Sequence, residues 1–285
     1  MNRNFVCKNN GFHSEFLRVF AMAAITLVHF VSVTCVFADE SDDRWNGIKQ
    51  AVFGEREIIE NANVISIQAP YRAHDAALVP ITLSAMIEQN HDHYIKELYL
   101  IVENNPTPLA GTFHFNPNHG WESIETRVRV NEYTNVRAVA ETSDGQLYMT
   151  KAYVKAAGGC SAPALSDQEA ALARLGKMKL RLDEIITAGQ PSVAQILVSH
   201  PNNSGMQFDQ ISRNYIPAYF VHKIGVSFNN EEVFTLDTNF SLSEDPSVHF
   251  TFVPKEDGVI NVYALDTKNN RFENSWPVTV AAPKS

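Results

Sequence analysis

Short apolar runs with polar, proline- or glycine-bearing turns between them dominate this sequence from Ile58 to Lys155. Side chains that alternate between apolar and polar with a period of two are typical of a strand with one buried face. The runs recur at near-regular intervals, which favours a β-sandwich of about seven strands. They read NVISIQAP, LVPITLSAMI, IKELYLIVEN, GTFHFNP, SIETRVRV, NVRAVAE and LYMTKAYVKA.

The same kind of pattern returns from Val193 to Val280, and it predicts a second, smaller sandwich of about six or seven strands. No helix alternates with strands in either region, which disfavours a Rossmann fold or a TIM barrel. The sequence therefore predicts an all-β chain with two domains. The runs of the second set are VAQILVSH, AYFVHKIGVSF, EVFTLD, SVHFTFV, VINVYALD and SWPVTVA.

A segment of a different character joins the two sets of strands. Residues 156–164 read AAGGCSAPA and carry no large apolar side chain, which predicts a mobile linker or arm. The next residues, SDQE, form a helix capping box, and apolar residues then recur every three or four positions as far as Ile185. A glycine and a proline follow as stop signals. We therefore expect one amphipathic helix over about 166–187.

The first 38 residues have the features of a cleaved secretory signal. Basic residues come first, an apolar stretch runs from Val19 to Phe37, and the acidic run DESDD follows. The basic region is long and His29 interrupts the apolar stretch, so an uncleaved membrane anchor is the alternative. A short amphipathic helix or cap is expected over 39–55.

Cysteine is scarce in this chain, with only Cys7, Cys35 and Cys160, which is too few for a disulfide scaffold. Cleavage of the signal would leave Cys160 as the only cysteine, without an intramolecular partner. The thiolate is the nucleophilic form of cysteine, and flanking glycines would present the sulfur without obstruction. A flexible arm suits a thiol that carries cargo between active sites better than it suits a cysteine protease. The alternative is a linker cysteine with no role.

Metal binding has a weaker signal. His91 and His93 have the spacing that places two imidazoles on one face of a strand, and His74, His114 or His119 could complete a site. The surrounding sequence QNHDHY is typical of a turn, however, which favours solvated histidines and no metal.

Motifs of enzymes and cofactor sites are missing from the sequence. Ser199 and His200 are adjacent, but no G-x-S-x-G elbow accompanies them. There is no phosphate loop, dinucleotide fingerprint, Cys-x-x-Cys pair or His-Glu-x-x-His motif either. With 45% hydrophobic residues and a net charge of −9, the chain has a globular composition and is no general polyanion binder. We expect neither catalysis nor a cofactor.

Two sets of motifs are distinctive in their order and spacing. The first set is LVPI at 78–81, VENNPTP at 102–108, TFHF at 112–115, VRV at 128–130, and DGQLY at 144–148 leading to the Gly-Gly-Cys of 158–160. The second set is VSHP at 198–201, Gly205, IPA at 216–218 and FV at 220–221. The first set resembles the SoxY subunit and the second resembles the SoxZ subunit of the sulfur-oxidation carrier SoxYZ. The chain therefore resembles a fused SoxYZ-like carrier, of the kind named for association with quinoprotein dehydrogenases.

The resemblance implies two immunoglobulin-like β-sandwiches and a periplasmic location. The expected division is a SoxY-like domain over 39–157, a cysteine arm and linker helix over 158–192, and a SoxZ-like domain over 193–285. Cys160 matches the cysteine to which SoxY attaches sulfur, and Gly158 and Gly159 match its flexible arm. The thiol would hold a thiosulfate-derived or other sulfur intermediate for partner enzymes of a sulfur-oxidation or quinoprotein dehydrogenase system.

The arm departs from the family pattern after Cys160. The arm of SoxY ends freely in Gly-Gly-Cys-Gly-Gly, whereas here Ser161, Ala162 and Pro163 follow the cysteine and the chain continues. An arm that is tethered at both ends can enter a partner only as a loop, and proline stiffens it. A non-catalytic binding or assembly module for a periplasmic quinoprotein dehydrogenase, with Cys160 incidental, is the alternative function.

Overall fold

A computed structural model of the chain describes residues 40–119, 121–163 and 168–282. The predicted signal, residues 1–38, lies outside the described residues. The chain divides into two compact units, Met1–Gly47 and Ile48–Ser285, and every strand that the structure describes belongs to the second. The helix expected over 39–55 is confirmed as α2 (Glu40–Phe53). No helix among the described residues has the length and apolar character needed to cross a membrane.

The all-β prediction is confirmed, and strands account for both halves of the second unit. The amino-terminal half contains β1 (Ile58–Glu60), β2 (Ile65–Gln68), β3 (Val79–Ala85), β4 (Ile95–Val102), β5 (Leu109–Phe115), the 3-10 turn η1 (Pro117–His119), β6 (Ser123–Val128), β7 (Thr134–Thr142) and β8 (Leu147–Val154). The carboxy-terminal half contains β9 (Met178–Leu182), β10 (Ser192–Val198), β11 (Phe208–Asp209), β12 (Asn214–Tyr215), β13 (Val221–Phe228), β14 (Glu231–Thr238), β15 (Ser247–Phe252), β16 (Gly258–Asp266) and β17 (Arg271–Val278).

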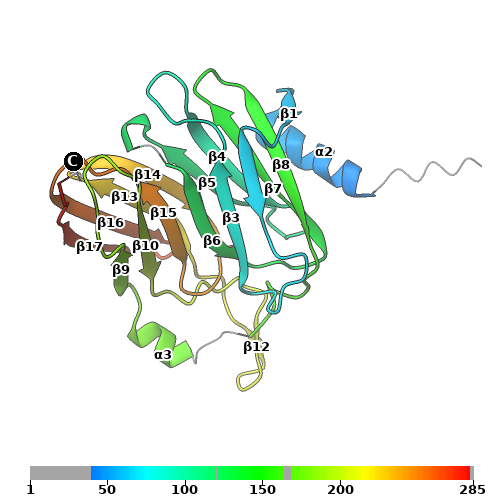
Figure 1. The fold of residues 1–285 in the computed structure, drawn as a ribbon. Helices are drawn as coiled ribbons and strands as arrows, with labels where there is room; N and C mark the ends of the chain where they lie inside the picture. Colours follow the sequence, from blue (N-terminus) through cyan, green and yellow to red (C-terminus); the bar gives the residue numbers. More distant parts are fainter. Residues whose placement is uncertain (1–39, 120, 164–167, 283–285) are drawn as a thin grey trace, which may run out of the picture. The chain divides into compact units, whose positions relative to one another are not determined.

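These strands form two large sheets that run through both halves of the unit (Figure 1). One described sheet has nine strands in the order β1-β8-β7-β4-β5-β14-β13-β16-β17, and the other has six in the order β2-β3-β6-β15-β10-β9. Each half contributes strands to both sheets, as expected for two sandwiches. The sheets are continuous across the halves, however, because β5 pairs with β14 and β6 pairs with β15.

The seam between the halves is built from close backbone pairing and shared apolar side chains. Phe115 lies opposite Phe234, and Phe113 lies opposite Leu236. A side chain at Gly111 would bring its Cβ to 2.9 Å from the Leu236 side chain, so the glycine permits the strands to approach.

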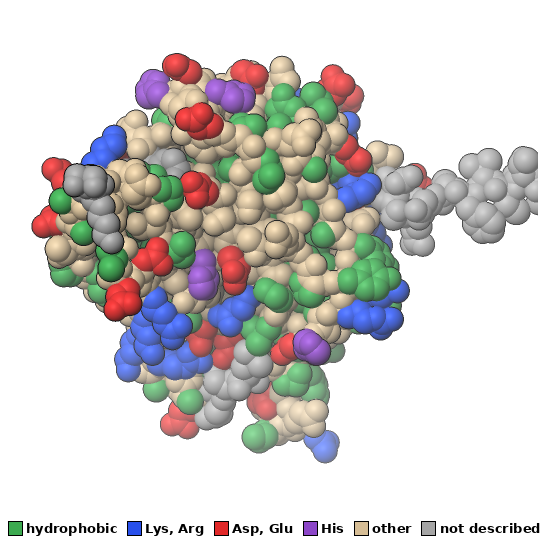
Figure 2. Space-filling view, in the orientation of Figure 1, with side chains coloured by type: hydrophobic (Ala, Val, Ile, Leu, Met, Phe, Trp, Pro, Cys, Tyr) green, Lys and Arg blue, Asp and Glu red, His purple; other side chains and the backbone are tan. Residues whose placement is uncertain are grey.

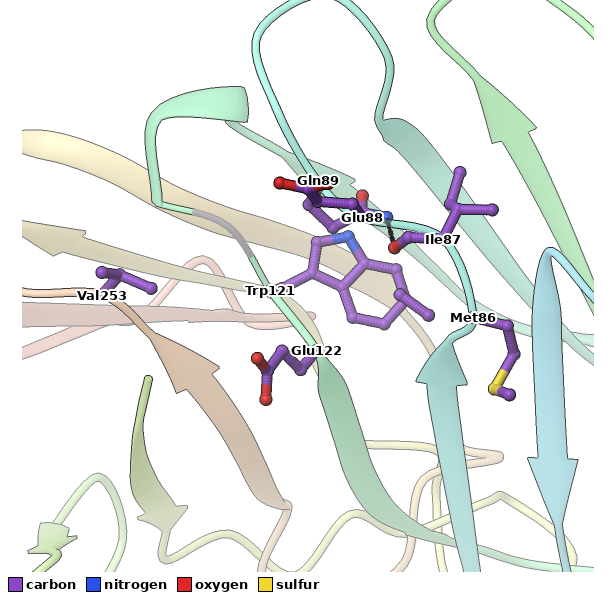
Figure 3. Close-up of a pocket in the computed structure, with 8 residues that line it drawn as sticks. Met86, Ile87, Glu88, Gln89, Trp121, Glu122 and Val253 are labelled. Carbon is purple, nitrogen blue, oxygen red and sulfur yellow. Dashed lines mark hydrogen bonds between the residues drawn. The ribbon is translucent and has the colours of Figure 1, made fainter. Parts of the chain in front are cut away.

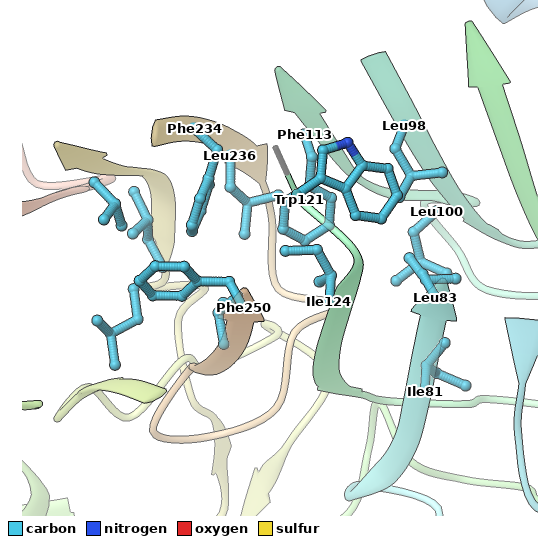
Figure 4. Packing of buried hydrophobic residues seen from close by; sticks show 14 of the residues in the cluster. Ile81, Leu83, Leu98, Leu100, Phe113, Trp121, Ile124, Phe234, Leu236 and Phe250 are labelled. Carbon is cyan, nitrogen blue, oxygen red and sulfur yellow. The ribbon is translucent and has the colours of Figure 1, made fainter. Parts of the chain in front are cut away.

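One hydrophobic core therefore extends across the seam (Figure 4). The ring of Phe234 lies 5.9 Å from that of Phe113 in the amino-terminal half, and 5.1 Å from that of Phe250 in an edge-to-face arrangement. All three rings are buried. Since burial of aromatic rings is a major stabilising contribution, the two halves stabilise each other.

The helix expected over 166–187 is wrong in extent. The described helix α3 covers only Gln168–Ala173, and the strand β9 follows at Met178–Leu182. Residues 177–182 read KMKLRL, which alternates with a period of two as well as fitting helical spacing. This segment pairs with the edge of β10 that β15 leaves open, and this tertiary pairing outweighs the helix propensity of the segment.

The strand β9 is the last strand of the six-stranded sheet and leaves one edge unpaired. Lys179 and Arg181 are exposed on it, and Figure 2 shows Lys and Arg side chains gathered on this part of the surface. Charged side chains on an edge strand discourage pairing with a second chain. This basic surface thus has a structural explanation.

Candidate functional site

The Gly-Gly-Cys segment docks against the body of the protein after β8 ends. The amide of Gly158 donates to the carbonyl oxygen of Asn131 (2.8 Å), and that of Gly159 donates to Val130 (2.9 Å). The amide of Ser161 then donates back to the carbonyl of Gly158, which closes a turn around Cys160. The Cys160 side chain has 0% exposure. The sequence predicts a mobile segment because it has no large apolar side chains. In the structure, main-chain hydrogen bonds hold this segment against the body of the protein instead.

Gly159 fits this place because it has no side chain. A Cβ atom there would lie 2.0 Å from the carbonyl oxygen of Ala76 and 2.7 Å from that of Val130. Both are backbone atoms that cannot move aside as a flexible side chain could. Gly158 meets a different demand: its φ of +80° favours glycine, although the space around it is open.

The loop after β10 covers the turn from the carboxy-terminal half. The Ser204 hydroxyl donates to the carbonyl oxygen of Cys160, and the Ser204 amide donates to Oε1 of Gln207 (3.0 Å). Asn202 is buried with a φ of 46°, and its side-chain amide donates to the carbonyl of Leu242 (2.9 Å). The loop is thereby fixed by its own polar side chains. The cysteine therefore lies between the two halves of the chain.

Arg129, just after β6, links the turn to this loop. Its guanidinium donates to the carbonyl oxygen of Gly159 (3.2 Å) and to that of Asn202 (3.3 Å). Only 1% of the residue is exposed. Its Nε is buried and has no hydrogen-bond partner among the described residues. Burial lowers the pKa of this arginine, because a charged group loses its hydration there.

Burial also sets the chemistry of the sulfur. It raises the pKa of the Cys160 thiol from 9.0 to about 11, and the positive charge of Arg129 opposes that rise. A thiol with this pKa is protonated at neutral pH, and the thiolate is the reactive form. The docked turn thus shelters an unreactive sulfur.

The histidines considered as metal ligands lie apart from this site. His91 and His93 fall in the exposed turn after β3, and His74 is also exposed. His114 lies on β5 between Glu97 (3.3 Å) and Asp237 (3.1 Å). The side chain of His119 lies outside the described residues. Across the part of the chain that the structure describes, no three His, Cys, Asp or Glu side chains form a group that could hold a metal ion.

Ser199 and His200 are both buried, and the histidine supports the loop over Cys160. Its Nδ1 accepts a hydrogen bond from the amide of Asn202 (3.0 Å), and its ring meets that of Tyr219 edge to face at 4.5 Å. Nε2 lies 3.6 Å from a carboxylate oxygen of Asp266. These contacts give the imidazole a structural role.

This buried imidazole should make the protein sensitive to acid. Burial lowers the pKa of His200 from 6.5 to about 4, so between these values the unfolded chain binds a proton that the folded chain does not. The free energy of unfolding should therefore fall by about 3 kcal/mol as the pH falls through this window. Urea unfolding at pH 7.5 and pH 4.5 measures the fall. His200→Gln should reduce it and His91→Gln should leave it unchanged; equal falls in both variants would contradict the assignment.

A separate surface pocket of about 440 Å³ lies at one end of the seam (Figure 3). The Trp121 indole forms part of its wall, and the Gln89 amide donates to the carbonyl of Ile87 at its rim. Its lining contains neither Cys160 nor a basic side chain: the residues are Ala85, Met86, Ile87, Glu88, Gln89, Trp121, Glu122 and Val253. The pocket therefore offers no nucleophile and no cation for an anionic ligand.

The two halves of the chain match two family models. The model of the sulfur oxidation protein SoxY matches residues 49–160, and that of the sulphur oxidation protein SoxZ matches residues 180–277. This chain is a fused SoxYZ-like protein. The SoxY match extends to Cys160 itself, and the SoxZ match contains the loop that covers it. The domains of this SoxYZ-like protein are those of a sulfur-oxidation carrier.

Solved structures similar to the SoxYZ-like protein each resemble part of it. The sulfur carrier protein SoxY from Chlorobium limicola f thiosulfatophilum is 23% identical, with 41% of this chain and 94% of that one covered and a TM-score of 0.34. A superoxide reductase (neelaredoxin) from Ignicoccus hospitalis is 18% identical, with coverages of 32% and 79% and a TM-score of 0.29. No curated protein matches the sequence.

The sequence predicts Cys160, Gly158 and Gly159 as site residues. It does not predict the residues around them, which are Arg129, Asn202, Ser204 and Gln207. Arg129 had a usable signal, because it is a charged residue inside the run VRV, which belongs to the SoxY-like motifs. Ser204 and Gln207 had no such signal. Ser204 lies 44 residues after Cys160, and the sequence near Ser204 does not show that its loop folds over the cysteine turn.

Proposed function

We propose that the SoxYZ-like protein is a periplasmic covalent carrier that holds a thiosulfate-derived or other sulfur intermediate on the Cys160 thiol. It would present this cargo to partner redox enzymes and would not catalyse a reaction itself. The observation that carries the proposal is the position of Cys160, which ends the SoxY match and lies in a glycine turn outside every strand. The signal-like sequence of residues 1–38 supports export.

Loading would require the turn to leave its place. The contacts that hold it are a few hydrogen bonds to backbone and to Ser204 and Arg129, each contributing about 1 kcal/mol. Their release would disrupt no strand. In water the thiol would regain an ordinary pKa, ionise more readily and become accessible.

A second function has an observation in its favour. Cys160 is fully buried, and burial raises its pKa, which are properties of a structural cysteine. On this reading the protein is a binding or assembly module for a periplasmic dehydrogenase, and the sulfur only fills space beside Arg129.

Mass spectrometry distinguishes the two functions. We expect protein isolated from its native periplasm without reductant to carry a mass increment on the Cys160 peptide that reduction removes. In vitro, the thiolate should attack the central S–S bond of tetrathionate, form Cys–S–S–SO₃⁻ and release thiosulfate. Cys160→Ser should show no increment in either experiment, since the attachment atom is gone. A free thiol in the native protein that also resists tetrathionate would contradict the carrier and support the assembly module.

A further inference from the structure

We infer that Arg129 and Gln207 form an anion site beside the docked sulfur, which receives the negatively charged end of a sulfur group attached to Cys160. This inference rests on the proposed function. It concerns the charge of the cargo that the docked turn can hold, and it adds two residues to the site.

No hydrogen bond from the Arg129 guanidinium to a carboxylate is present among the described residues. The hydrogen bonds of its guanidinium go to two carbonyl oxygens, those of Gly159 and Asn202. Glu244 and Asp75 act on it through charge without a hydrogen bond, and Glu244 pairs with Arg174 at 3.2 Å. A buried cation without a bonded anion is costly unless an anion joins it. An anionic group on the neighbouring sulfur would supply one.

Unused hydrogen-bond donors from both halves belong to the same network. Nε of Arg129 and Nε2 of Gln207 are buried without a partner among the described residues. Arg129 binds the carbonyl of Gly159, and Gln207 binds the amide of Ser204, whose hydroxyl binds the carbonyl of Cys160. Both orphan donors are thus one or two hydrogen bonds from the cysteine turn. Buried N–H groups are almost always satisfied, and anionic oxygen or sulfur accepts such donors strongly.

A pair of adducts on Cys160 tests the inference. Tetrathionate gives the anionic Cys–S–S–SO₃⁻ with release of thiosulfate. Methyl methanethiosulfonate gives the neutral Cys–S–S–CH₃ with release of methanesulfinate. The rate at which dithiothreitol removes each adduct is compared with its rate on a peptide of sequence AAGGCSAPA. We expect the protein to protect the anionic adduct about tenfold or more better than the neutral one, because charged hydrogen bonds are the stronger kind.

Two variants separate the anion site from simple packing. Arg129→Gln also removes the hydrogen bond to Gly159 that helps to dock the turn, so it should lower the protection of both adducts about fivefold. The anionic adduct should lose about tenfold more protection than the neutral one. Arg127→Gln is the matched control, because Arg127 lies two positions before Arg129, near the end of β6, and binds the carbonyl of Asp245 (3.2 Å). It should behave as wild type. Equal losses for both adducts in Arg129→Gln would show a packing role and overturn the inference.

The outcomes also separate this inference from the proposed function. If Arg129→Gln does not fold, the comparison of the two adducts in the wild-type protein decides alone, and equal protection overturns the anion site. Uptake of both reagents with equal protection leaves the carrier function standing. A wild-type protein whose Cys160 takes up neither reagent overturns the carrier function, and the anion site with it.

Discussion

Gly159→Ala should make the Cys160 thiol react with iodoacetamide about 100-fold faster than in the wild-type protein at neutral pH. The new Cβ would meet the backbone oxygen of Ala76 at 2.0 Å, so the turn cannot dock as it does now. Once undocked, the thiol loses the burial that raises its pKa from 9.0 to about 11. Two pKa units correspond to about a hundredfold more thiolate, before steric access is counted. The rate is measured by quenching the alkylation at successive times and determining the alkylated fraction of Cys160 by mass spectrometry.

Gly158→Ala provides the matched control for this effect. It adds the same methyl group one residue earlier, where nothing lies within 4 Å of the new Cβ. Its φ of +80° costs an alanine about 1 kcal/mol, which should raise the rate only several-fold. Cys160→Ser has no thiol at this position and gives the background rate of alkylation. A Gly159→Ala protein that reacts at the wild-type rate would show that the turn does not dock in solution.

Phe234→Ala should lower the free energy of unfolding by about 3 to 5 kcal/mol, and it should do so for both halves of the protein together. The ring is fully buried and contacts Phe113 in one half and Phe250 in the other. Its removal leaves a cavity at the seam. Because both sheets cross this seam, urea unfolding followed by circular dichroism should show one transition at a lower midpoint.

Phe208→Ala makes the same chemical change at an exposed position. Phe208 lies on β11, in the small β11–β12 hairpin, and is 47% exposed. Its loss should change the free energy of unfolding by much less, about 1 kcal/mol. Two separate transitions in Phe234→Ala, with the amino-terminal half keeping the wild-type midpoint, would mean that the halves are independent.

The individual strands could be predicted because each carries its own signal. A run such as VPITLSA alternates within itself, and short-range alternation needs no knowledge of the partner strand. The seam could not be predicted this way. Pairing of Phe115 with Phe234 joins residues 119 positions apart in the numbering, and neither strand differs locally from one at an open edge. Gly111 had a faint signal only, as a glycine inside a strand.

The candidate site likewise has features that local sequence shows and features that only distant contacts determine. Cys160 and its glycines were recognisable from sequence, because a cysteine between small residues is conspicuous by composition. Its burial was not, since main-chain donors of Gly158 and Gly159 fix the turn and every residue type except proline carries such donors. The short α3 and the strand β9 reflect the same limit: KMKLRL satisfies two periodicities, and only the free edge of β10 selects one.

The place of Cys160 between the halves has a consequence for how such a carrier survives dilution. Its cover consists of backbone near Val130 from one half and Ser204 from the other, so separate subunits would have to remain associated to keep the sulfur sheltered. Here one polypeptide supplies both. Joining two binding surfaces replaces a bimolecular encounter by an intramolecular one at a fixed effective concentration, on the order of millimolar for short linkers. Dilution of the protein therefore does not separate Cys160 from the loop that contains Ser204, because both belong to one chain.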